Sequence, residues 1–82
     1  VDNISVENRL ALLLYPNPAN AYLNVFMNAY EQEDMIHIYD TNGKLLIIKL
    51  VVGAVTMVPV QSLSSGMYIV RVGERIGKFF KE

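Results

Sequence analysis

Turn-forming residues cut the chain into short segments, and this spacing restricts the possible folds more than any other feature. Clusters of Pro, Gly, Asn, Asp and Ser recur about every ten residues, and the runs between them are rich in Val, Ile, Leu, Tyr and Phe. A globular helix needs an apolar pattern of period 3.6 sustained over roughly ten residues or more, and no segment supplies one. The sequence therefore predicts an all-β protein.

The runs between the turns predict about seven short strands. They are Leu10 to Leu14, Tyr22 to Met27, Met35 to Tyr39, Leu45 to Val52, Ala54 to Val60, Met67 to Val72 and Arg75 to Phe80. Leu23, Val25 and Met27 alternate with Tyr22, Asn24 and Phe26, and Val58 and Val60 are expected to face inward in the same way. Pro59 has no N–H, so its strand is expected at a sheet edge or at a bulge.

Two local motifs sharpen the fold prediction. Asp40-Thr41-Asn42-Gly43 reads as a hairpin turn, in which Gly43 would adopt the positive φ that closes the loop. Leu63, Gly66 and Tyr68 have the spacing of a tyrosine corner, although Tyr68 could equally be an ordinary half-buried strand aromatic. Seven short strands with such a corner predict a small immunoglobulin-like antiparallel β-sandwich.

Composition excludes several classes of function. With 82 residues the chain has room for one domain, and 52% hydrophobic residues can supply its core. The absence of cysteine excludes a disulfide scaffold and a Cys/His zinc site. A net charge of −1 argues against a nucleic-acid module built on a basic face.

No residue pattern predicts catalysis, a cofactor or a metal. His37 is the single histidine and lies in a predicted strand between Ile36 and Ile38, where a surface histidine is the favoured interpretation. Glu31, Glu33 and Asp34 could hold a hard cation such as calcium, but their spacing is not that of an EF-hand, and a solvated acidic loop is favoured. The expectation is a protein that is not an enzyme.

The first residues and one uncharged stretch bear on membranes and export. Val1 to Arg9 is polar and lacks the apolar run of a signal peptide, so residues 1–9 are expected to be a linker from an upstream region, and residues 10–82 the domain. Leu50 to Val70 carries no charge, but Gly, Pro and Ser interrupt it too often for a membrane span.

Five motifs, in this order and spacing, resemble one family over most of the chain. They are Tyr15-Pro16-Asn17-Pro18-Ala19, Leu23-x-Val25, Ile38-Tyr39-Asp40-Thr41-Asn42-Gly43-Lys44, Leu63-Ser64-Ser65-Gly66-Met67-Tyr68-Ile69-Val70 and Lys78-Phe79-Phe80-Lys81. From about residue 13 onward the chain is similar to the C-terminal sorting domains of type IX (Por) secretion cargo. Two departures are Ser64-Ser65, where the family often has a proline, and Glu82 after the final lysine.

The resemblance implies an immunoglobulin-like domain that directs a larger cargo protein across the outer membrane of Bacteroidetes-type bacteria. The expected partners are the upstream cargo, the outer-membrane secretion machinery and a surface sortase, which usually removes the domain and attaches the cargo to an anionic lipopolysaccharide. The expected location is the periplasm in transit, then the outer membrane and cell surface, or release. The resemblance assigns the sorting motif to Tyr15, Pro16, Asn17, Pro18, Asp40, Gly43, Lys44, Gly66, Tyr68, Lys78 and Lys81.

A second function and a self-association remain open on the residues alone. A cell-surface adhesion or carbohydrate-binding sandwich would need exposed aromatics gathered together, for which Tyr22, Tyr30 and Tyr39 are the candidates; alternatively they cover the rim of the core. Leu45 to Val58 carries a single charge, Lys49, so at least one of its two strands is expected to be a weakly protected edge. Dimers or strand-swapped forms of the isolated domain are therefore expected at high concentration.

Overall fold

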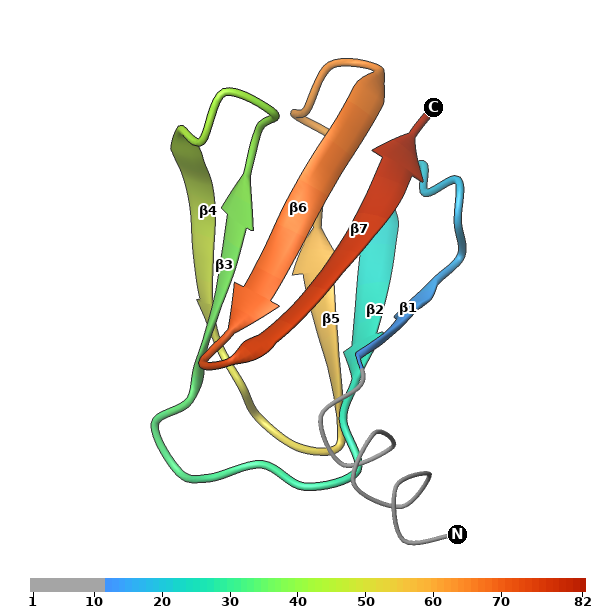
Figure 1. Cartoon of the computed structure of the whole chain (residues 1–82). Helices are drawn as coiled ribbons and strands as arrows, with labels where there is room; N and C mark the ends of the chain where they lie inside the picture. Colours follow the sequence, from blue (N-terminus) through green and yellow to red (C-terminus); the bar gives the residue numbers. More distant parts are fainter. Residues whose placement is uncertain (1–11) are drawn as a thin grey trace, which may run out of the picture.

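The computed structural model describes residues 12–82, which form seven antiparallel strands in two sheets (Figure 1). The strands are β1 (Leu13–Tyr15), β2 (Tyr22–Phe26), β3 (Met35–Tyr39), β4 (Leu45–Leu50), β5 (Val55–Pro59), β6 (Gly66–Val72) and β7 (Arg75–Lys81). Within these residues there is no helix, and so none that could cross a membrane. The all-β prediction is confirmed.

The two sheets have the strand order of an immunoglobulin-like sandwich. One sheet has three strands in the order β1-β2-β5, and the other has four in the order β4-β3-β6-β7. These correspond to the A-B-E and C′-C-F-G strands of immunoglobulin-like domains. The predicted fold class is thus confirmed, and the strand bounds differ from the prediction mainly by one or two residues at their ends.

Alternating side chains from both sheets fill the core. The fully buried side chains include Leu23, Val25, Met27, Ile36, Ile38, Val58, Val60, Val70 and Phe79. The inward positions predicted in β2 and around β5 are therefore correct. Pro59 lies on β5, an outer strand of the three-stranded sheet, as its missing N–H requires.

The predicted first strand is only partly tested. Its observed part, β1, covers Leu13–Tyr15, one residue beyond the predicted end. Residues 10 and 11, and the linker expected over residues 1–9, lie outside the described residues.

Successive strands run in opposite directions, so the connections gather at two ends of the sandwich. One end, which we call the distal end, carries the β1–β2, β3–β4 and β5–β6 connections and the last residue, Glu82 (Figure 1, top). The opposite, proximal end carries the start of β1 and the β2–β3, β4–β5 and β6–β7 connections.

The sandwich is closed along one side and open along the other. A parallel bridge joins Ala19 to Lys81, and Gly77 on β7 lies so close to β1 that a Cβ atom there would be 3.0 Å from Cδ1 of Leu14. β1 and β7 therefore meet along the closed side. β4 and β5 are the outer strands on the open side.

Candidate recognition site

The distal end brings together residues from all the predicted sorting motifs except Leu23-x-Val25. Tyr15 ends β1, and Pro16, Asn17 and Pro18 begin the β1–β2 connection. The turn from Asp40 to Lys44 joins β3 to β4. Gly66 and Tyr68 lie in the first half of β6, Lys81 ends β7, and Lys78 is the middle residue of β7. Residues far apart in the sequence thus share one end of the domain.

Three hydrogen bonds tie the β1–β2 connection to the end of β7. The backbone N–H of Phe80 donates to Oδ1 of Asn17 at 2.9 Å. The N–H of Ala19 donates to the carbonyl of Phe80 at 2.7 Å, and the N–H of Glu82 donates to the carbonyl of Ala19 at 2.8 Å. Ala19 is fully buried beneath these contacts. The first and last motifs therefore form one hydrogen-bonded unit, which we call the terminal clasp (residues Asn17, Ala19, Phe80 and Glu82).

The turn between β3 and β4 is organised by the side chain and backbone of Asp40. Its Oδ1 accepts hydrogen bonds from the N–H groups of Asn42 and Lys44, both at 2.9 Å. Its carbonyl accepts from the N–H of Gly43 at 3.0 Å, and its own N–H donates to the carbonyl of Lys44 at 3.0 Å. Gly43 has a φ of 89°. The predicted hairpin turn, with its positive φ at Gly43, is confirmed.

Tyr68 forms the predicted tyrosine corner. Its hydroxyl donates a hydrogen bond to the carbonyl of Ser64 at 2.7 Å, four residues upstream. Tyr68 as a whole is 7% exposed, and its ring stacks on that of Phe79 with centroids 5.7 Å apart. The corner thereby fixes the β5–β6 connection to the core, and Gly66 starts β6 with a φ of 148°.

The three lysines of the motif differ in their surroundings. Lys44 and Lys78 are exposed, whereas Lys81 is 8% exposed and its Nζ donates to the carbonyl of Glu82 at 3.0 Å. The other motif residues also differ in solvent exposure. Tyr68 is buried, and four residues are exposed: Tyr15, Pro16, Asn17 and Pro18. Tyr68 and Lys81 are therefore buried within the domain, and the exposed residues form the surface that a partner could contact.

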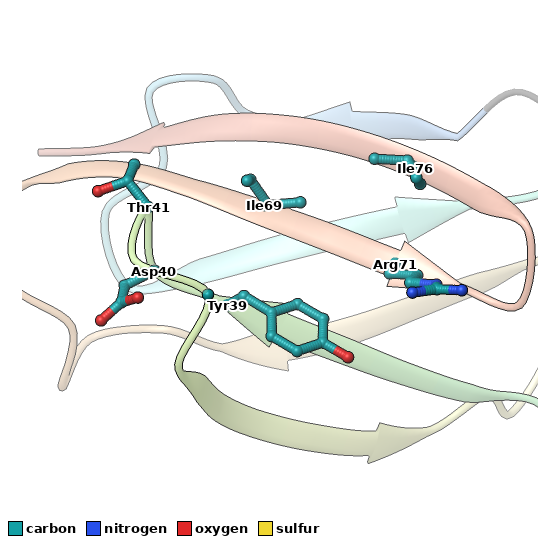
Figure 2. Close-up of a pocket in the computed structure, with 7 residues that line it drawn as sticks. Tyr39, Asp40, Thr41, Ile69, Arg71 and Ile76 are labelled. Atoms are coloured by element: carbon teal, nitrogen blue, oxygen red, sulfur yellow. The ribbon is translucent and has the colours of Figure 1, made fainter.

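An open depression lies beside the Asp40 turn on the outer face of the four-stranded sheet. It has a volume of about 320 Å³ and is lined by Tyr39, Asp40, Thr41, Gly43, Ile69, Arg71 and Ile76. Figure 2 shows Tyr39 lying along the face that also carries Ile69 and Arg71. Oδ1 of Asp40 is already held by its own turn, and Nε of Arg71 donates to the carbonyl of Gly73 at 2.9 Å. Nothing in this lining resembles an acid–base pair.

The residues considered for chemistry take ordinary surface positions. The His37 ring is half-buried on β3 and stacks on Tyr39, with centroids 6.2 Å apart. In the β2–β3 connection, Oδ2 of Asp34 accepts from the N–H of Glu31 at 2.8 Å. Within residues 12–82, no group of three or more acidic, His or Cys side chains is arranged to hold a metal ion.

The tyrosines that would serve an adhesion surface do not gather. Leu23 and Ile38 point into the core, so the adjacent Tyr22 and Tyr39 lie on the outer faces of opposite sheets. Tyr30 lies in the β2–β3 connection at the proximal end. The alternative function, a carbohydrate-binding or adhesion module, is not supported.

Sequence reasoning did not identify the partners that hold the motifs together. Asn17 and Phe80 are 63 residues apart, and Ala19 entered only as part of a turn motif. No residue type in the sequence marks the backbone carbonyl of Ser64 as the acceptor of the Tyr68 hydroxyl. The resemblance of residues 15–19 and 78–81 to one family was the only hint that these segments act together.

Comparison with known proteins gives the family. A family model described as "Secretion system C-terminal sorting domain" matches residues 13–82. A search of curated proteins finds no significant match. The matched range includes all seven strands, the terminal clasp and the turn at Asp40. The chain therefore belongs to the family of secretion system C-terminal sorting domains, the sorting signals of type IX secretion.

Proposed function

We propose that the secretion machinery reads this sorting signal at the distal end, as a surface built from several motifs of the folded domain. The exposed side chains of the motif are the ones offered to a partner: Tyr15, Pro16, Asn17, Pro18, Lys44 and Lys78. The remaining motif residues maintain the conformation of that surface; they are Asp40, Gly43, Gly66, Tyr68 and Lys81.

The observation that carries this proposal is the terminal clasp. It holds Asn17 and Ala19 against Phe80 and Glu82, so the first and last motifs adjoin when β7 lies in its folded place beside the β1–β2 connection. A component of the secretion machinery that contacts both motifs would therefore bind the folded domain and not an unfolded chain.

Family membership implies interaction with the secretion machinery and with an upstream cargo region, and export across the outer membrane toward the cell surface or release. Beyond this, we propose a periplasmic stage in which the domain folds, followed by removal by a surface sortase. The family is not known as catalytic, and we propose that this domain has no activity of its own.

Export of a reporter protein tests whether the secretion machinery recognises the distal end. The reporter would be fused upstream of the 82-residue chain, with a signal peptide, in a host that has a type IX system. Removing residues 75–82 deletes β7 and half of the clasp, so the reporter should stay in the periplasm. Normal export of the truncated fusion would rule out the proposal.

A matched pair of charge reversals separates recognition from folding. Lys44 and Lys49 are both exposed and lie near opposite ends of β4. Lys44→Glu should reduce export, because it changes charge at the distal end, while Lys49→Glu should leave export unchanged. Equal export of the two variants, at equal thermal stability, would place the recognition surface elsewhere.

A further inference from the structure

The open side of the sandwich has two outer strands, and they differ in how they are protected. An outer strand presents unpaired N–H and C=O groups, which natural proteins guard with charges, bulges or proline. β4 has two such guards. Its pairing with β3 is irregular between Ile38 and Tyr39, and Lys49 occupies a position opposite the core residue Ile36. The register places Lys49 on the core-facing side of β4 while its side chain stays exposed, and a charge in that position opposes pairing with a further strand.

The closed side is also protected. β1 has only three residues. On β7, Asn17 and Ala19 already occupy the outward groups of Phe80, and Arg75, Lys78 and Lys81 add charge along the strand. Among the described outer strands of more than three residues, this leaves β5 with neither a charged residue nor a bulge, and its one guard is Pro59 at its end.

The hydrogen-bond register shows which groups of β5 are open. Met27 donates to the carbonyl of Ala54, and Val60 donates to the carbonyl of Ala21, both at 2.9 Å. Because antiparallel pairs alternate, residues 54, 56, 58 and 60 turn their backbone groups toward β2. Val55, Met57 and Pro59 turn theirs outward, and their side chains are exposed on the outer face.

We propose that β5 pairs with β5 of a second copy of this chain, antiparallel and about a two-fold axis at Met57. This register alone overlaps all five residues of β5, setting Met57 opposite Met57 and Val55 opposite Pro59. The two Met57 residues exchange both hydrogen bonds, and each Val55 N–H donates to the carbonyl of Pro59 in the other copy. Pro59, which has no N–H, thus takes part only as an acceptor.

The chemistry of β5 favours a second copy as the occupant. β5 carries no charge in either copy, so the paired strands do not repel each other electrostatically. Val55, Met57 and Pro59 of both copies form one uncharged outer face that continues from one β5 strand to the other. A five-residue contact falls in the smallest class of interfaces, below about 1,200 Å². The dimer should therefore be weak, forming only at high concentration and dissociating on dilution. This association does not depend on which end of the sandwich the secretion machinery reads.

Single cysteines test the register, because the chain contains none. Paired residues in such a ladder have Cα atoms about 5.5 Å apart, within the range that a disulfide spans. Met57→Cys should therefore form a disulfide-linked dimer at least about tenfold faster than Val55→Cys, since a paired thiol experiences a high effective concentration. The two positions are similarly exposed, at 54% and 44%, so Val55→Cys is a matched control.

Ile48→Cys is the control for pairing through β4, because Ile48 is 53% exposed on that strand. Equal rates at positions 57 and 55, or faster linkage at position 48, would overturn the proposal.

Light scattering of the 82-residue chain adds a test without cysteine. Its weight-average mass should rise from that of the monomer toward that of the dimer as the concentration increases to about 1 mM. Met57→Lys should abolish this increase and Ile48→Lys should not; a chain that stays monomeric throughout would overturn the proposal.

Discussion

The side-chain oxygen of Asn17 accepts a hydrogen bond from the backbone N–H of Phe80 at 2.9 Å, across 63 residues of sequence. Phe80 lies near the end of β7, where an outer strand would otherwise present this N–H to solvent. The amide of one motif thereby completes the hydrogen bonding of another. Asn17 is a structural residue of the clasp as well as part of an exposed loop.

Replacing Asn17 with alanine should loosen the clasp. The variant loses one hydrogen bond to an exposed backbone group, so we expect a loss of about 1 kcal/mol in the free energy of unfolding. Hydrogen exchange at the amides of Ala19, Phe80 and Glu82 should also become faster. Asn20→Ala is the control, because Asn20 is exposed in the same connection. Unchanged exchange at Phe80 would show that the Asn17 bond does not hold the clasp.

The Asp40 turn gives a prediction about backbone conformation. Gly43→Val should lower the free energy of unfolding by more than about 1 kcal/mol, because β-branched residues resist a φ of 89°. A Cβ atom at this position would have no atom within 4 Å other than those of its chain neighbours, so we assign the loss to the backbone conformation. Gly43→Asn should cost less, since asparagine tolerates this region. Equal stability of all three proteins in thermal unfolding would contradict the assignment of strain to φ.

The tyrosine corner can be tested by removing a single oxygen. Tyr68→Phe keeps the ring stacked on Phe79 but leaves the carbonyl of Ser64 without its partner. The expected loss in the free energy of unfolding is about 1 kcal/mol. Tyr39→Phe, on the outer face of β3, should change stability by less than about 0.5 kcal/mol. If the two losses measured by chemical denaturation are the same, the hydroxyl of Tyr68 has no special role.

Features that depend on local pattern could be predicted from the sequence. The alternation of Leu23, Val25 and Met27 identified an inward face, because strand side chains have a period of two. Asp40 and Gly43 identified a turn, because their conformational preferences are properties of the residues themselves. The tyrosine corner needed only the spacing of Gly66 and Tyr68, although a second interpretation remained open until the bond to Ser64 was seen.

Features that depend on which strands are neighbours could not be predicted. The bond from Phe80 to Asn17 requires the β1–β2 connection to lie beside β7 of the other sheet, which no local preference specifies. Lys49 was counted as one charge on a weakly protected stretch. Its protective position opposite Ile36 follows only from the register of β3 with β4. The predicted self-association itself remains a prediction, now assigned to β5.

The closed side of the sandwich yields the last prediction. A Cβ atom on Gly77 would lie 3.0 Å from Cδ1 of Leu14, closer than packed carbon atoms normally approach. Gly77→Ala should therefore require the Leu14 side chain to shift by a few tenths of an ångström, and we expect a loss of about 1 kcal/mol in the free energy of unfolding. Gly53→Ala is the control, because the nearest atom to a Cβ there is 4.0 Å away and its φ is not positive. Shortening Leu14 to alanine should relieve the crowding, so Leu14→Ala combined with Gly77→Ala should cost less than the sum of the single changes. Strictly additive losses in denaturant unfolding would mean that Gly77 and Leu14 are not in contact.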